Sequence, residues 1–280
     1  MLCIDNLWVK FPTSQGLFEA VRGISFSLSH ERLGIVGESG SGKSLTGRAI
    51  LRLIRHPAIV KANYITFHEQ NVLDLKEKEM RKIRGRRISM VMQDPKFSLN
   101  PVMTIGSQII EAYRQHNQAS YKVAFRNALE MLEAVLIHDP ERVMRCYPHE
   151  VSGGMGQRIM IAMMLIPNPE VLIADEPTSA LDVSVQRQVM KILDNLVTER
   201  GMGLILISHD LNLVSEFCDR ILIMYAGRIV EVCDAAKLRQ ASHPYTQGLL
   251  NSLPRLSERV PRLTVLQRDI NWTEAASVRG

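Results

Sequence analysis

The 280-residue sequence has few aromatic residues and no long hydrophobic run. Phe, Trp and Tyr supply 5% of the residues, whereas hydrophobic residues as a whole supply 46%, so we expect the aliphatic core of an ordinary soluble protein. No stretch approaches the roughly 18 consecutive apolar residues of a membrane-spanning helix. The amino terminus carries an acid, Asp5, where a signal peptide would carry bases. We therefore expect a cytosolic protein.

Cysteine is also scarce, and its pattern excludes two further classes of protein. The four cysteines form no CxxC pair and no cluster with histidine, which argues against a thiol metal site or a disulfide framework; they are Cys3, Cys146, Cys218 and Cys233. Reduced, mostly buried thiols are expected instead. The net charge of +5 is too mild to identify a partner. Low-complexity segments and short-period repeats are absent from the sequence.

The first quarter of the chain reads as strands followed by a glycine-rich loop. Alternating apolar and polar residues predict an antiparallel strand at 2–11, and 24–28 is a second candidate. A short apolar run at 33–37 leads into the loop, and a helix is predicted over 45–55, ending before Pro57. The order strand, loop, helix is the order that a phosphate-binding loop requires.

The middle of the chain is helical, and strands return after it. Apolar residues recur at helical spacing from about 94 to 166, most clearly over 121–136 and 153–165. Strands are then predicted at three aliphatic runs, 171–174, 204–207 and 221–224. The first two suit parallel strands covered on both faces, with a crossover helix at 183–198. We expect an α/β core interrupted by a helical insertion, and a loosely packed tail from residue 254.

Residues 37–44 match the pattern GxxxxGK[ST] at every fixed position. They read Gly37, Glu38, Ser39, Gly40, Ser41, Gly42, Lys43 and Ser44. Glycines allow successive backbone N–H groups to point at phosphate oxygens, and the following helix adds its positive end. Lys43 is expected to reach the β- and γ-phosphates of ATP, and the Ser44 hydroxyl to ligate Mg²⁺. A chance Gly/Ser loop is the alternative, which the strand and helix on either side disfavour.

Two adjacent acids, Asp175 and Glu176, follow the apolar run 171–174. Neighbouring strand residues point to opposite sides, so the two carboxylates can serve different functions. Asp175 is expected to hold Mg²⁺ through its water shell, and Glu176 to orient or deprotonate the attacking water. Two surface acids at a strand end are the alternative reading, which would be preferred without the phosphate loop.

A second anion-binding helix end is predicted at Ser152, Gly153 and Gly154. Serine is a good N-cap, and paired glycines expose the backbone at the start of the helix over 153–165. One nucleotide needs only one phosphate loop, so this second end raises the question of whose phosphate it meets. An ordinary capped helix remains the alternative.

Taken together, these motifs resemble the nucleotide-binding subunits of ABC transporters over nearly the whole chain. Residues 37–44 resemble the Walker A loop, 174–177 Walker B with its catalytic glutamate, and 152–155 the signature motif. The remaining matches are the Q-loop glutamine Gln93, the D-loop 179–182 and the switch histidine His209. Phe11 stands where the family places an aromatic residue that stacks on adenine, and Trp8 is a competing candidate.

The resemblance implies a P-loop NTPase (RecA-like) α/β core, an N-terminal antiparallel β subdomain and an inserted α-helical subdomain. Residues 1–250 would form the ATP-binding domain, with the helical subdomain at approximately 94–166, and 251–280 a C-terminal extension.

The resemblance also implies a head-to-tail dimer, in which each ATP lies between the Walker A loop of one subunit and the Ser152 region of the other. Gln93 would sense the γ-phosphate and contact Mg²⁺, and His209 would hold the γ-phosphate and the attacking water. Asp182 of the D-loop would also belong to the nucleotide site.

Residues 93–95, 98–101 and 243–250 look like the dipeptide, oligopeptide and nickel importer branch of this family. A loop entering an amphipathic helix is the alternative for 243–250. The branch implies a second ATPase subunit, expected to be a non-identical paralogue, with two membrane permeases and an extracytoplasmic solute-binding protein. The chain would then lie at the cytoplasmic face of the inner or plasma membrane. Peptides are the first choice of cargo, and nickel or a nickel–chelator complex is the second.

Two departures from the branch affect the interpretation. The tail lacks the cysteines that many members carry there, so we predict no iron–sulfur cluster. Gly156 replaces a larger residue, and a helical glycine costs about 1 kcal/mol relative to alanine, which bears on local helix stability or partner contacts.

Two other classes of ATPase are weighed against the importer. A nucleic-acid-processing ATPase would separate its motifs by coiled coils or zinc sites, and the stretch between Ser44 and Ser152 has neither. We therefore expect no nucleic-acid partner. A translation-associated ABC protein would carry two heads, whereas this chain carries one.

Overall fold

The computed structural model describes residues 1–93, 98–179, 181–252 and 272. The chain forms two compact units, one made of residues 1–74 and 206–280 and the other of residues 75–205. Each unit is described in turn. Within the described ranges, no helix combines the length and the apolar character needed to cross a membrane.

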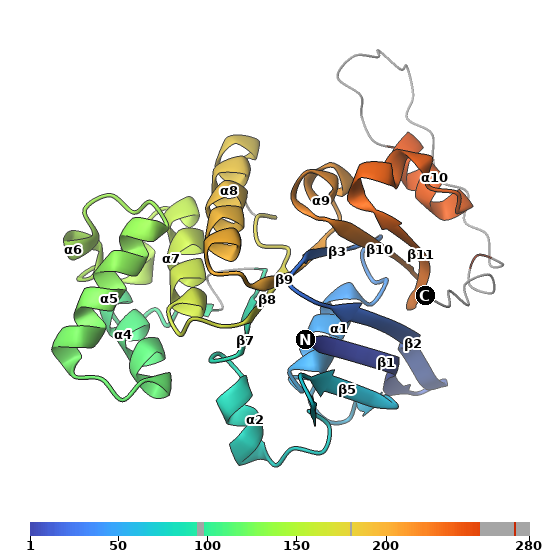
Figure 1. Ribbon diagram of the computed structural model, residues 1–280, viewed down its shortest axis with the longest axis horizontal. Helices are drawn as coiled ribbons and strands as arrows, with labels where there is room; N and C mark the ends of the chain where they lie inside the picture. Colours follow the sequence, from blue (N-terminus) through green and yellow to red (C-terminus); the bar gives the residue numbers. More distant parts are fainter. Residues whose placement is uncertain (94–97, 180, 253–271, 273–280) are drawn as a thin grey trace. The chain divides into compact units, whose positions relative to one another are not determined.

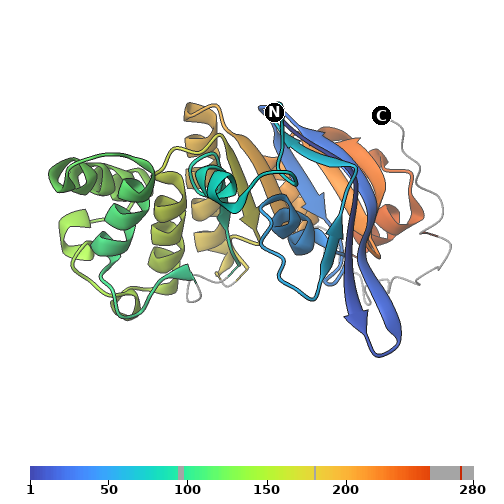
Figure 2. The same cartoon turned by 90° about the horizontal axis from the view of Figure 1, so that it is seen from below.

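The first unit contains an antiparallel sheet built around its N-terminal strand. That strand pairs with three others, and a fifth strand continues the sheet; they are β1 (Leu2–Thr13), β2 (Gly16–Leu28), β4 (Ile59–Lys61), β5 (Tyr64–Phe67) and β6 (Gln70–Asn71). Leu2 and Ile4 of β1 are buried, and so are Leu7 and Val9, so the predicted alternation changes phase between the two pairs. The change occurs at Asn6, which has φ of 52°, where the register with β2 shifts. Figure 2 shows the β1–β2 hairpin projecting from this unit. Leu17 and Phe18, near the turn of this hairpin, are exposed.

The same unit holds a second group of strands that carries the phosphate loop. Its strands are β3 (Arg32–Val36), β10 (Arg220–Tyr225) and β11 (Arg228–Asp234). Strand β10 is parallel to β3 and antiparallel to β11. Its helices are α1 (Lys43–Ile50), α9 (Leu211–Phe217), η2 (Ala235–Gln240) and α10 (Pro244–Asn251). These strands confirm the predictions made for 33–37 and 221–224.

Helix α1 is shorter than the sequence predicts. We expected a helix over 45–55, but it ends at Ile50 because Arg52 takes a left-handed conformation with φ of 52°. The Arg52 N–H then donates to the Ala49 carbonyl at 3.0 Å, and the Leu53 N–H donates to the Arg48 carbonyl at 2.9 Å. This pair of bonds is a Schellman closure, which satisfies the last carbonyls of the helix.

The second unit combines two parallel strands with a group of helices (Figure 1). Strands β7 (Ile88–Val91) and β8 (Val171–Asp175) pair in parallel, and β9 (Gly203–Ser208) carries the chain into the other unit. The helices are α2 (Glu77–Ile83), α4 (Ile105–His116), α5 (Tyr121–Ala134), α6 (Pro140–Val143), η1 (Pro148–Glu150), α7 (Gly153–Leu165) and α8 (Val183–Glu199). Helices α4, α5 and α7 pack against one another, forming the inserted helical group.

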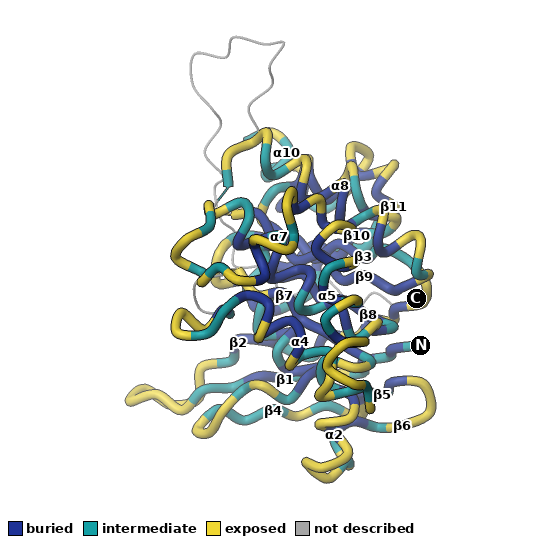
Figure 3. The backbone as a smooth tube through the Cα atoms, turned by 90° about the vertical axis from the view of Figure 1, so that its left-hand side faces the viewer, coloured by how far each residue is buried: buried dark blue, intermediate teal, exposed yellow. Residues whose placement is uncertain are grey.

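The buried strands agree with their near-continuous aliphatic sequences. Every residue of β8 and of β9 is buried, and Figure 3 shows both strands in dark blue. Strands β4 to β6 escape prediction because they span only two to four residues, too few for a period of two to be recognised. The α/β fold with an antiparallel β part and a helical insertion is thus confirmed.

The cysteine prediction is confirmed only in part. All four thiols are free, but only Cys218 is buried, whereas Cys3, Cys146 and Cys233 are half-buried. The expectation of mostly buried thiols is therefore wrong, because Cys3 and Cys233 lie on strands whose alternation points them partly outward. Burial raises the pKa of the Cys233 thiol to about 11, and the nearby charges of Glu231 and Asp234 add to this shift.

Candidate nucleotide site

The phosphate loop joins β3 to α1 in the first unit. Gly37, Gly40 and Gly42 have φ of 154°, 82° and 100°, a region that side chains with a Cβ rarely adopt. A Cβ on Gly37 would collide with the Met224 carbonyl oxygen, and one on Gly42 would lie 2.6 Å from the Ala20 carbonyl oxygen. Glycine is thus required at both positions by conformation and by space.

The loop encloses a cation and an unpartnered hydroxyl. Lys43 is 5% exposed, and its Nζ donates to the carbonyl oxygens of Gly37 at 2.8 Å and Glu38 at 2.9 Å. The Ser41 Oγ is buried without a hydrogen-bond partner, although buried polar atoms are normally satisfied. The Ser41 carbonyl, in turn, accepts from the Gly227 N–H at 3.1 Å, which ties the loop to the turn between β10 and β11. A buried ammonium group and an unsatisfied hydroxyl in one loop fit an anionic group such as phosphate.

Gln93 and Glu176 are brought together in the second unit by the register of two parallel strands. Val91 of β7 is opposite Ala174 of β8, and each of the two side chains follows its strand partner by two residues. Gln93 Nε2 donates to Glu176 Oε2 at 3.2 Å. Asp175, at the end of β8, is 2% exposed, whereas Glu176 is half-buried with φ of 47°. The two acids therefore occupy different environments.

The predicted cap of α7 is present. Ser152 Oγ accepts from the Met155 N–H at 3.4 Å, and the helix begins at Gly153 as expected. A Cβ on Gly153 would meet nothing within 4 Å, but one on Gly154 would lie 2.9 Å from Val185 of α8. Gly154 is therefore needed for close packing of two helices, whereas packing within the unit does not require Gly153.

Gly156 and Gln157 lie further along α7. The helix continues through Gly156, whose N–H donates to the Ser152 carbonyl at 2.8 Å, so the helix is formed despite its glycine. Gln157 is buried, and its side-chain amide donates to the carbonyl of Pro177. Sequence reasoning did not identify Gln157, because no local pattern links it to the segment after Glu176.

Asp182 and His209, the two remaining predicted site residues, differ in their surroundings. Asp182 Oδ1 accepts from the Ser184 hydroxyl at 2.7 Å and from the Val185 N–H at 3.0 Å, so it caps α8. These hydrogen bonds hold the pKa of the Asp182 carboxyl below its ordinary value. His209 is exposed and directly follows β9 in the first unit. Asp94 and Pro95 of the branch motif, Ala180 of the D-loop and nearly all of the C-terminal extension lie outside the described residues.

The two candidate adenine-stacking residues lie on β1. The indole of Trp8 is engaged within the sheet, since its Nε1 donates to Asn6 Oδ1 at 2.8 Å and Lys10 Nζ lies 4.5 Å from its ring centroid. Phe11 is half-buried and lies opposite Phe18 on β2. Because Trp8 already has these partners, Phe11 is the better candidate.

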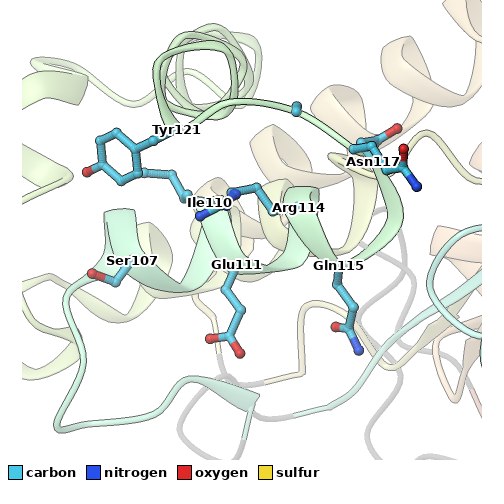
Figure 4. A pocket seen from close by; sticks show the side chains of 9 residues that line it. Ser107, Ile110, Glu111, Arg114, Gln115, Asn117 and Tyr121 are labelled. Carbon is cyan, nitrogen blue, oxygen red and sulfur yellow. The ribbon is translucent and has the colours of Figure 1, made fainter.

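A hollow of about 640 Å³ lies on the helical insertion, and Figure 4 shows it from close by. It is lined by α4, the connection after it and the start of α5, including Ser107, Arg114 and Tyr121. Glu111 and Gln115 point to the same side of α4 (Figure 4). None of the predicted nucleotide residues lines this hollow, so it is not the nucleotide site.

Comparisons with known proteins agree with this geometry. The family model described as ABC transporter matches residues 21–179. The dipeptide transport ATP-binding protein DppD of Haemophilus influenzae is 47% identical over 269 residues, covering 95% of this chain and 82% of that protein. The oligopeptide transport ATP-binding protein OppD of Bacillus subtilis is 45% identical, covering 91% of this chain and 72% of that protein.

Solved structures of similar fold also come from ABC transporters. The dimeric structure of a bacterial ABC transporter cassette has a TM-score of 0.75 and 26% identity, covering 84% of this chain and 99% of that one. CbiO1 from Clostridium perfringens, part of the ABC transporter complex cbiONQ, has a TM-score of 0.72 and 25% identity, covering 85% of this chain and 90% of that one. With its glycine-rich loop, its paired strand-end residues and these relatives, the chain belongs to the ABC transporter family, among its ATP-binding subunits.

Proposed function

We propose that this chain is the ATP-hydrolysing subunit of an importer of di- or oligopeptides. The observation that carries the choice of cargo is its likeness, over more than nine-tenths of its length, to dipeptide and oligopeptide transport ATP-binding proteins. The same likeness favours peptides over nickel, the second cargo considered from the sequence. Residues 1–250 are assigned to the ATP-binding domain, 94–166 to its helical insertion and 251–280 to a C-terminal extension.

ATP is proposed to bind the phosphate loop through its phosphates. The loop contributes N–H groups, the Ser41 hydroxyl and the Lys43 ammonium group, and the adenine stacks on Phe11. The buried position of Lys43 and the unpartnered Ser41 Oγ support this assignment. On binding, Lys43 exchanges the two carbonyl oxygens that it now contacts for phosphate oxygens, so its charge stays compensated throughout. Ser39 and the three glycines, Gly37, Gly40 and Gly42, complete the cradle.

Hydrolysis is assigned to the side chains at the carboxyl ends of β7 and β8. Glu176 orients or deprotonates the attacking water, and Gln93 holds the carboxylate in place through its amide. Ligands of parallel α/β sheets bind outside the carboxyl ends of the strands, which is where this pair lies. His209 is assigned to the γ-phosphate and the water.

Mg²⁺ is proposed to be held by Ser44, Gln93 and Asp175. Their hydroxyl, amide and carboxylate oxygens are the hard donors that Mg²⁺ prefers. Asp175 is almost fully buried at its strand end, a place where a carboxylate is stable when a cation is near. The bound ion would neutralise charge on the phosphate oxygens.

A second ATPase subunit is proposed to complete the site. Ser152, Gly153 and Gly154 would meet the γ-phosphate bound by that partner, with Asp182 near the same interface. The exposure of Ser152 and Gly153 at the start of α7 supports this role. The partner is proposed to be a non-identical paralogue, and the pair to act on two permeases at the cytoplasmic face of the membrane. An extracytoplasmic binding protein would deliver the cargo.

The test is transport by the assembled importer. The chain would be reconstituted in vesicles with its partner ATPase and permeases, and the binding protein would be supplied outside, loaded with a dipeptide, a longer peptide or nickel. We expect peptide-loaded binding protein to stimulate ATP hydrolysis and peptide uptake. Stimulation by nickel alone would contradict the peptide assignment, and no ATP hydrolysis under any condition would contradict the ATPase assignment.

A further inference from the structure

Tyr245 of α10 connects the C-terminal part of the first unit to the phosphate loop. Its ring is fully buried, with the ring of Tyr225 at 4.5 Å and that of Trp272 at 5.8 Å between centroids. Its hydroxyl accepts a hydrogen bond from the backbone N–H of Glu38 at 3.0 Å. Tyr245 and Glu38 are 207 positions apart in the sequence, so this contact exists only in the folded chain.

This hydrogen bond acts on a peptide unit that Lys43 also holds. The N–H of Glu38 and the C=O of Gly37 belong to the same peptide group, and that C=O accepts from Lys43 Nζ at 2.8 Å. The group is trans, so its N–H and C=O point in opposite directions. Tyr245 and Lys43 therefore hold it from opposite sides. A rotation of this peptide would break both hydrogen bonds.

Tyr245 is itself held firmly at the start of α10. Its backbone N–H donates to His243 Nδ1 at 3.2 Å, which caps the helix. The carboxylate of Glu231 on β11 accepts from the N–H groups of Ser242 at 2.7 Å and His243 at 3.2 Å. The Tyr245 hydroxyl is therefore held in a fixed position at the phosphate loop. Its ring is buried, and the start of α10 is bound to β11 through Glu231.

We propose that Tyr245 is a positioning residue for nucleotide binding, which orients the Gly37–Glu38 peptide of the phosphate loop. The inference rests on the proposed function of that loop. When ATP draws Lys43 toward its phosphates, the Tyr245 hydroxyl still holds this peptide through the Glu38 N–H. Without the hydroxyl, the peptide must be ordered by the nucleotide, and that ordering reduces affinity.

The experiment compares Tyr245→Phe with Tyr225→Phe in the full chain. Each variant loses one hydroxyl from the same aromatic cluster, but the Tyr225 hydroxyl has no hydrogen bond among the described residues. Calorimetric titration with ATP and Mg²⁺ should show a Kd about three- to tenfold higher for Tyr245→Phe, the range expected for one hydrogen bond. The Kd of Tyr225→Phe should stay within about twofold of the parent.

A spectroscopic measurement separates positioning from general packing. With ¹⁵N-labelled glutamate, the amide resonance of Glu38 should shift in Tyr245→Phe and stay in place in Tyr225→Phe. An unchanged Glu38 resonance would overturn the inference. A lower Tm with unchanged Kd would also overturn it, because Tyr245 would then serve packing alone.

Lys43→Ala distinguishes failure of the inference from failure of the proposed site. We expect this variant to lose most of its ATP affinity. If it binds ATP normally, the loop is not the nucleotide site. If Lys43→Ala fails to bind while Tyr245→Phe binds as tightly as the parent, only the positioning role of Tyr245 is wrong.

Discussion

A single carboxylate, that of Glu176, is expected to decide whether bound ATP is hydrolysed. Changing Glu176 to Gln keeps the shape of the side chain and an acceptor for the Gln93 amide, but it removes the charge that activates water. We expect hydrolysis by the assembled transporter to fall by about 10²- to 10⁴-fold, the usual contribution of a general base, while ATP still binds. Phosphate release measures the rate, and size-exclusion chromatography with ATP should show an accumulated dimer.

The matched control for this change is Glu199→Gln. Glu199 is an exposed carboxylate at the end of α8, so the same loss of charge there should leave hydrolysis unchanged. A normal rate of ATP hydrolysis in Glu176→Gln would show that Glu176 does not activate the attacking water. An equal loss in both variants would point to a general effect of charge.

At the scale of an element, the start of α10 should respond to pH. Burial holds the pKa of His243 below its ordinary value, although the nearby negative charge of Glu231 acts in the opposite direction. The folded state thus favours the neutral ring, whose Nδ1 can accept from Tyr245. This stabilisation is fully present above about pH 6.5, the unfolded value, and is lost as the pH falls through the lower folded pKa.

His243→Asn provides the comparison, because asparagine can cap the helix without titrating. Urea unfolding at pH 7.5 and pH 5.5 should show a larger loss of unfolding free energy for the parent than for His243→Asn. Equal losses in the two proteins would mean that His243 does not titrate in this range.

Helix α4 of the insertion gives a stability prediction that is independent of the nucleotide. Thr104 Oγ1 accepts from the Ser107 N–H at 3.3 Å and caps this helix. Thr104→Ala should lower the free energy of unfolding by about 1 kcal/mol, whereas Thr104→Ser should retain most of it. Chemical denaturation measures both values. A loss as large in the serine variant would show that the threonine methyl group, and not the cap, is responsible.

At the scale of the whole molecule, the proposed output is closure of a site shared by two subunits. Gly153→Asp tests this, because a Cβ there meets nothing within 4 Å and an acid at a helix start is favourable. We expect an unchanged or slightly higher Tm, with ATP hydrolysis by the assembled transporter reduced at least about tenfold by repulsion of the partner's phosphate. Normal hydrolysis in Gly153→Asp would contradict a role for this helix end in the shared site.

Much of this molecule can be predicted from local sequence. Helix α7 begins and ends where the apolar spacing places it, with Ser152 as its cap. The end of α1 could not be predicted, because Arg52 closes the helix in a conformation usually left to glycine. Strands β4, β5 and β6 could not be predicted from their own sequences, because they are too short to show a pattern. Their pairing with β1, or with each other, defines them.

The sequence alone determined the candidate site residues: the phosphate loop at 37–44, the acids Asp175 and Glu176, and the capped helix at Ser152. Each is a pattern of neighbouring residues, so chain order is enough to recognise it. Only the tertiary structure showed the hydrogen bonds between Gln93 and Glu176 and between Tyr245 and Glu38. These pairs are 83 and 207 positions apart, and only strand register and helix packing bring them together.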